Sequence, residues 1–74
     1  MTYIVIEIQT STDGTVGNFV FTFDDRNAAE SKYHAILAAA AVSAVYMHSA
    51  VLMTSTGVQV AHQSYTHADE EGEN

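Results

Sequence analysis

An Asp-Gly pair with an alternating segment on each side most constrains what this chain can fold into. Residues 3–9 place three isoleucines on one face of an extended strand, and residues 18–23 place three phenylalanines on one face of another. Asp13-Gly14, between the two segments, suits the positive φ angles of a hairpin turn. The pattern predicts an antiparallel hairpin whose phenylalanine face meets a helix.

The next segment has the pattern of an amphipathic helix. Asp25 is placed to cap the first free amides, and Asn27 with Glu30 offers an alternative capping box. An apolar stripe at helical spacing should face the sheet. It consists of Ala29, Tyr33, Ile36, Leu37, Ala40 and Ala44. The other side is rich in alanine, which either permits close approach by another helix or reflects only the high helix propensity of alanine.

Two more strands complete the fold. Residues 45–54 carry large apolar groups on both faces, as a central strand does, and residues 58–65 are more polar, as suits a sheet edge. The order β-β-α-β-β predicts a two-layer α+β fold, a four-stranded, mostly antiparallel sheet with one helix on one face. One helix cannot cover both faces, so we expect the second face to pack against another copy.

The size of the chain also points to self-association. The 74 residues contain no cysteine, so no disulfide can support the small core that a chain of this length buries alone. Burial between subunits is the remaining common source of stability. We expect a homo-oligomer, either a dimer or a larger assembly.

The net charge of the chain limits the classes of partner that it can bind. Nine acidic and two basic residues give a net charge of −7, which disfavours direct binding to nucleic acid. Four of the acidic residues fall within residues 68–74, which we expect to form a disordered acidic tail after one compact domain, residues 1–67. That domain has five acidic and two basic residues, a net charge of −3, so its surface is a poor mimic of DNA.

The same sequence predicts a cytoplasmic protein without a membrane span. No segment approaches the roughly 20 apolar residues that a membrane-spanning helix needs. Residues 1–4 lack the basic region and cleavage site of a secretory signal.

The candidate functional residues are aromatic side chains and histidines. None of the four histidines has a metal-binding spacing, and we find no nucleophile elbow or phosphate loop, so we expect no metal, no cofactor and no enzymatic activity. Pairing across the last hairpin should oppose residues whose numbers sum to about 113, which makes His48 and His62 possible near neighbours. The group predicted to contact a ligand or partner is Tyr46, His48, His62 and Tyr65.

Three segments followed by an alanine run, residues 3–10, 13–17 and 25–34, resemble small uncharacterised proteins from phages and prophages of gut Firmicutes. The resemblance implies a phage accessory protein that binds a host protein or a small nucleotide-like signal and antagonises host defence, in the manner of an anti-CRISPR or by sequestering the signal. The alternative is a minor virion or tail-assembly protein. It implies no catalytic residue.

Overall fold

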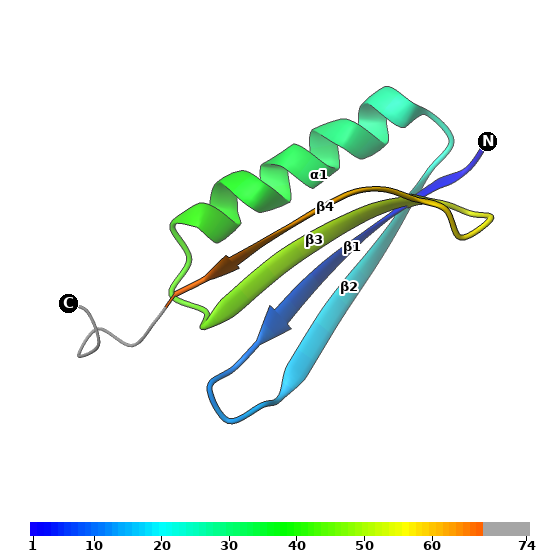
Figure 1. The fold of residues 1–74 in the computed structure, drawn as a ribbon. Helices are drawn as coiled ribbons and strands as arrows, with labels where there is room; N and C mark the ends of the chain where they lie inside the picture. The colour runs from blue at the N-terminus through cyan, green and yellow to red at the C-terminus, as the bar shows by residue number, and fades with distance from the viewer. Residues whose placement is uncertain (68–74) are drawn as a thin grey trace.

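The computed structural model describes residues 1–67. They form one sheet and one helix (Figure 1): β1 (Tyr3–Thr10), β2 (Val16–Phe23), α1 (Arg26–Ala41), β3 (Met47–Thr54) and β4 (Gln59–Thr66). All neighbouring strands are antiparallel, and their order is β2-β1-β3-β4. The predicted α+β fold is confirmed, with β3 inside the sheet and β4 at its edge. The predicted acidic tail, residues 68–74, lies outside the described residues.

The β1–β2 turn forms where the Asp-Gly pair predicts it. The Thr15 amide donates to Asp13 Oδ1 at 2.9 Å, and the Gly14 amide donates to the Ser11 carbonyl at 2.9 Å. Gly14 has a φ of 91°, a conformation that side chains with a Cβ rarely adopt. The strands then pair without a bulge along their full length of eight residues each.

Helix α1 starts at its predicted cap. The Asp25 carboxylate accepts a hydrogen bond from the Ala28 amide at 3.0 Å. The buried residues of the helix are Ala29, Tyr33, Ile36 and Ala40. The helix ends where the Val42 and Ser43 amides donate to carbonyls only three residues earlier, those of Ala39 and Ala40. Ala44 therefore lies beyond the helix and is exposed, so its predicted place in the helical stripe is wrong.

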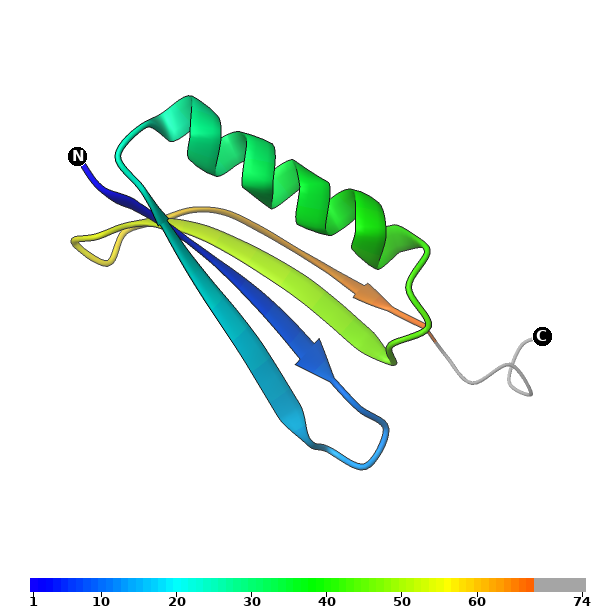
Figure 2. The same ribbon diagram turned by 180° about the vertical axis from the view of Figure 1, so that it is seen from behind.

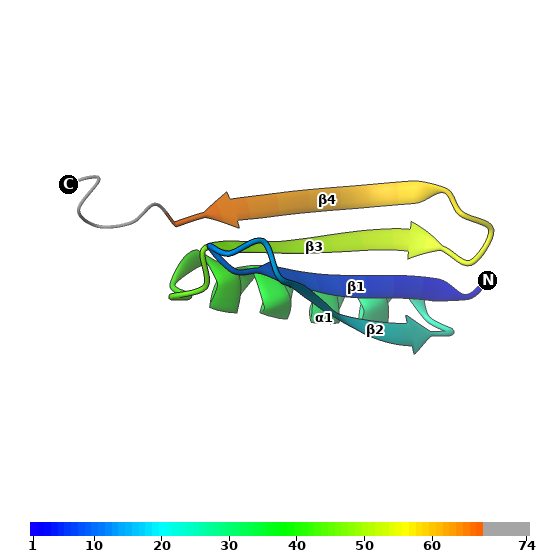
Figure 3. The same cartoon turned by 90° about the horizontal axis from the view of Figure 1, so that it is seen from below.

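Helix α1 lies along one face of the sheet and leaves the other face open (Figures 2 and 3). The core between the two layers consists of Val5, Ala29, Tyr33, Ile36, Ala50 and Leu52. Phe21 and Phe23 pack against this core, as the expected contact between the phenylalanine face and the helix requires. Phe19 shares that face but is 54% exposed, because the N-terminal half of β2 diverges from α1 (Figure 1).

The β3–β4 hairpin has the predicted register over most of its length. His48 lies opposite Tyr65 and Val51 opposite His62, pairs whose numbers sum to 113. The register shifts between Leu52 and Met53. Strand β3 spans residues 47–54 where the sequence predicted 45–54, because the chain bends at residues 45 and 46 before it enters the sheet. Strand β4 spans residues 59–66 where the sequence predicted 58–65.

Candidate functional site

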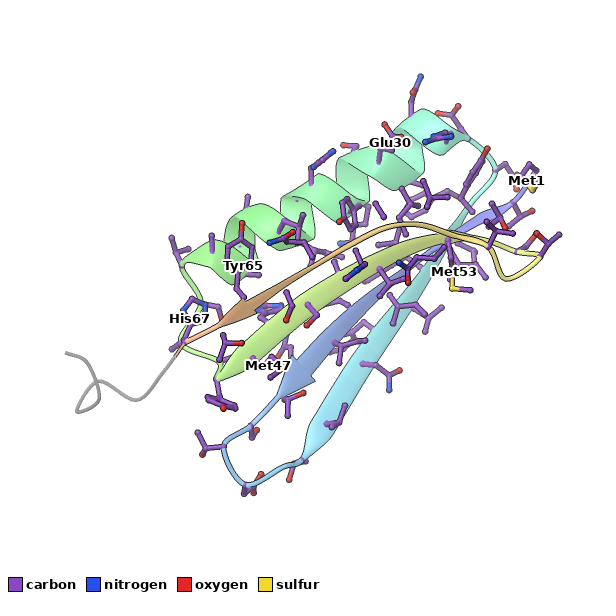
Figure 4. All side chains as sticks on the ribbon, in the orientation of Figure 1. Met1, Glu30, Met47, Met53, Tyr65 and His67 are labelled. Carbon is purple, nitrogen blue, oxygen red and sulfur yellow. The ribbon has the colours of Figure 1, made fainter. Side chains whose placement is uncertain are left out.

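The structure brings three of the four predicted site residues to one end of the molecule. His48 and Tyr65 are cross-strand partners on the helix side of the sheet, and Tyr65 rises from β4 towards α1 (Figure 4). Tyr46 directly precedes β3, and its carbonyl accepts a hydrogen bond from the His67 amide at 2.6 Å. This end therefore gathers Tyr46, His48, Tyr65 and His67.

His62 does not belong to this group. It lies opposite Val51, three residues along β3 from His48. Side chains alternate across a strand, so an odd separation places the two histidines on opposite faces of the sheet. The predicted proximity of His48 and His62 is wrong, although the pairing rule behind it holds.

His48 instead pairs with a carboxylate that the sequence did not single out. Its Nε2 atom lies 2.6 Å from Glu7 Oε2, and the Gln9 amide group donates to the same oxygen at 3.1 Å. The His48 side chain is 6% exposed and that of Glu7 is 17% exposed. Glu7 lies two residues after the buried Val5, on the same face of β1. An acidic residue on a buried face needs a polar partner, and this position could have pointed to the pair from the sequence.

In the Glu7–His48 hydrogen bond, His48 is the donor and Glu7 the acceptor. Burial raises the pKa of Glu7, but hydrogen bonds from His48 and Gln9, together with the charges of His48 and Lys32, outweigh it and hold the pKa of this carboxyl below its usual value. The carboxylate is ionised at neutral pH and can only accept, so His48 Nε2 carries the proton. His48 Nδ1 is buried and has no hydrogen-bond partner among the described residues.

His67 ties the end of β4 to the end of the helix. Its Nε2 atom lies 2.7 Å from the Ala40 carbonyl, which belongs to the last turn of α1, where carbonyls have no partner within the helix. The ring nitrogen therefore donates to this carbonyl. Within residues 1–67, no three His, Asp or Glu side chains are arranged to hold a metal ion.

Within residues 1–67, no element packs on the sheet face away from α1, here called the open face. Its apolar residues are Ile4, Ile6 and Ile8 of β1, Val16 and Val20 of β2, and Met47, Val51 and Met53 of β3. Figure 4 shows Met53 on this side of the sheet. The other strand positions on this face are Thr10, Asn18, Thr22, Ser49, Gln59, His62, Ser64 and Thr66. No Asp, Glu, Lys or Arg lies among these strand positions.

Comparison with known proteins adds no assignment: no family model matches the chain, and neither curated proteins nor solved structures gave a match. Within residues 1–67, no helix combines the length and the apolar character that crossing a membrane requires. The resemblance to phage proteins stays a prediction.

Proposed function

We propose that this chain is a non-enzymatic binding module that associates with itself through the open face. The observation that carries the proposal is an aliphatic surface without charge in a chain of net charge −7. The charged residues among residues 1–67 lie in the first turn, around and within α1, or on the helix side of the sheet. Two copies that meet through their open faces therefore keep these charges apart.

The open face is large enough for a stable contact. Eight residues per strand at about 3.3 Å and four strands at about 4.8 Å give roughly 500 Å² per copy before side-chain relief is counted. Two copies together reach the roughly 1,000 Å² above which specific interfaces are found. Aliphatic residues in the middle, with threonine, serine and asparagine around them, match the usual division of an interface into apolar centre and polar rim.

The buried Glu7–His48 pair supports binding rather than catalysis. A carboxylate next to an imidazole is a common acid–base arrangement, but a reacting group must reach it. The 6% exposure of His48 leaves no such approach. The pair therefore joins β1 to β3, and the accessible chemistry of this end is that of the tyrosines and backbone around it.

One substitution at the centre of the open face tests self-association. Ile6→Lys places a charge between Val20 and Val51, its neighbours across the sheet. Val58→Lys is the matched control, because Val58 is 60% exposed and lies in the β3–β4 turn. By native mass spectrometry and sedimentation, Ile6→Lys should halve the number of subunits, whereas Val58→Lys should keep it. Wild-type protein that stays monomeric at high concentration would contradict the proposal.

We further propose, on the resemblance, that the module is a phage accessory protein that binds a host factor or a small nucleotide-like ligand and antagonises host defence. The end at which Tyr46 and Tyr65 lie beside the buried His48 is the contact region to test. Expression should protect a phage or plasmid from an immune system, and Tyr65→Ala should reduce protection while the fold persists. Failure to protect against every tested system, together with recovery of the protein from purified virions, would favour the tail-assembly alternative.

A further inference from the structure

We propose that the outer edge of β2 pairs antiparallel with β2 of a second copy, so that the two sheets become continuous. This contact uses backbone groups along the sheet margin and is distinct from stacking of the open faces. Strand β2 ends the sheet order β2-β1-β3-β4, so among the described residues only β1 pairs with it. Figure 3 shows it at the margin of the sheet.

Strand β2 lacks the features that keep an edge strand from pairing. Proteins usually protect such edges with charged residues, proline or a bulge. Residues 16–23 contain no charged residue and no proline, and their pairing with β1 has no bulge. The other edge differs, because β4 is more polar and its pairing with β3 contains a register shift.

The side chains of β2 are also exposed where an added strand would lie. Val16 and Val20 are each 58% exposed and Phe19 is 54% exposed. Segments that combine aromatic and β-branched residues with no charge have a strong tendency to add further strands. A chain that folds stably with this edge therefore needs a specific strand to occupy it.

The second copy is the occupant that β2 itself fits. A two-fold axis perpendicular to the sheet makes neighbouring strands antiparallel and keeps both helices on the same face. With the axis at Val20, Phe19 of each copy lies opposite Phe21 of the other, and Gly17 lies opposite Phe23. Aromatic cross-strand pairs stabilise sheets, and an aromatic ring opposite glycine covers its bare backbone. The absence of charge on β2 removes repulsion between two acidic copies.

Edge pairing and face stacking are compatible. The edge contact leaves both open faces on the same side, as one surface twice as wide, and two such dimers stack into a tetramer. The tetramer, but not the edge pairing, rests on the proposed function.

Two substitutions separate the contacts. Phe19→Lys puts a charge on the helix side of the β2 edge without changing the open face, and Val42→Lys is its control at a position 85% exposed after α1. By native mass spectrometry, we expect the wild type and Val42→Lys to be tetramers. Phe19→Lys alone and Ile6→Lys alone should each give dimers, and the double variant Phe19→Lys/Ile6→Lys should give monomers. If Phe19→Lys leaves the subunit number unchanged, edge pairing is overturned, whereas the same result for Ile6→Lys contradicts only the open-face proposal.

Cross-linking provides a second readout. The chain has no cysteine, so Val20→Cys introduces a single thiol. Two residues directly opposite in an antiparallel pair have Cα atoms about 4.5–5.5 Å apart, within disulfide range. In the Ile6→Lys background, where open-face stacking is blocked, Val20→Cys should form a disulfide-linked dimer on mild oxidation and Val58→Cys should not. Equal, slow cross-linking of both variants would overturn the pairing.

Discussion

His48 Nε2 and Glu7 Oε2 lie 2.6 Å apart between β3 and β1, although the two residues are 41 positions apart in the sequence. The contact sits on the helix side of the sheet, where Ala50 lies opposite Glu7 and the neighbouring core cluster is apolar. A charge-assisted hydrogen bond in such surroundings is costly to break, because each partner is left without its counterpart. The pair therefore makes the alignment of β1 with β3 sensitive to substitution and pH.

Removal of the Glu7 carboxylate should destabilise the fold. Glu7→Ala leaves His48 Nε2 without its acceptor, and we expect a loss of about 1–3 kcal/mol in the free energy of unfolding. Glu7→Gln, which retains an acceptor oxygen, should lose less. The double variant Glu7→Leu/His48→Leu should lose less free energy of unfolding than the single variants Glu7→Leu and His48→Leu lose together. In the double variant, neither polar group of the pair is left without its partner. Urea unfolding measures all of these values, and strict additivity would argue against coupling.

Stability should fall at acidic pH partly through Glu7. The pKa of Glu7 is lower in the folded state than its ordinary value of 4.5, so the folded state binds this proton less tightly than the unfolded state. The stabilisation that ionised Glu7 gives the fold is complete above the pKa of Glu7 in the unfolded chain. It is lost as pH falls through the lower pKa of Glu7 in the folded state. Urea midpoints measured from pH 7 to pH 3 should decline less steeply for Glu7→Gln and for His48→Leu than for wild type. An identical decline in all three would contradict this assignment.

The helix cap predicts a difference between two adjacent aspartates. Asp25 accepts the Ala28 amide, so Asp25→Ala should lower the free energy of unfolding by about 1 kcal/mol. Asp24 has no such contact with the described residues and is exposed, so Asp24→Ala should change it by less than about 0.5 kcal/mol. Thermal unfolding followed by circular dichroism compares the two. Equal losses would mean that general charge near the helix start, rather than the cap, matters.

Two glycines should respond oppositely to alanine. Gly57 has a φ of 96°, so Gly57→Ala should cost about 1–2 kcal/mol of backbone strain. Gly17 lies in β2 without a positive φ, and nothing lies within 4 Å of the position of an added Cβ. Gly17→Ala should be neutral or stabilise by up to about 1 kcal/mol, because it restricts the unfolded chain. Chemical denaturation at low protein concentration separates these effects, and a loss at both positions would refute this explanation.

Much of the fold could be predicted because its signals are local. Alternation in β1 and β2, the turn at Asp13-Gly14 and the cap at Asp25 each depend on residues a few positions apart. Even the β3–β4 register followed from the position of its turn. Boundaries were less accurate: the helical stripe was extended to Ala44, because the spacing continues past the residue at which the chain must bend towards β3.

The sequence by itself determined the element order, the stripe of the helix that meets the sheet as far as Ala40, the phenylalanine face of β2 that meets the helix, and an apolar second sheet face. Only the tertiary structure decided which distant residues meet. It joined His48 to Glu7, because β1 lies between β2 and β3 in the sheet. The place of His62 on the opposite face follows from the hairpin register, since an odd separation along a strand reverses the direction of the side chain. Strand order, and contacts between strands that no turn joins, depend on the packing of the whole chain, and no local pattern encodes them.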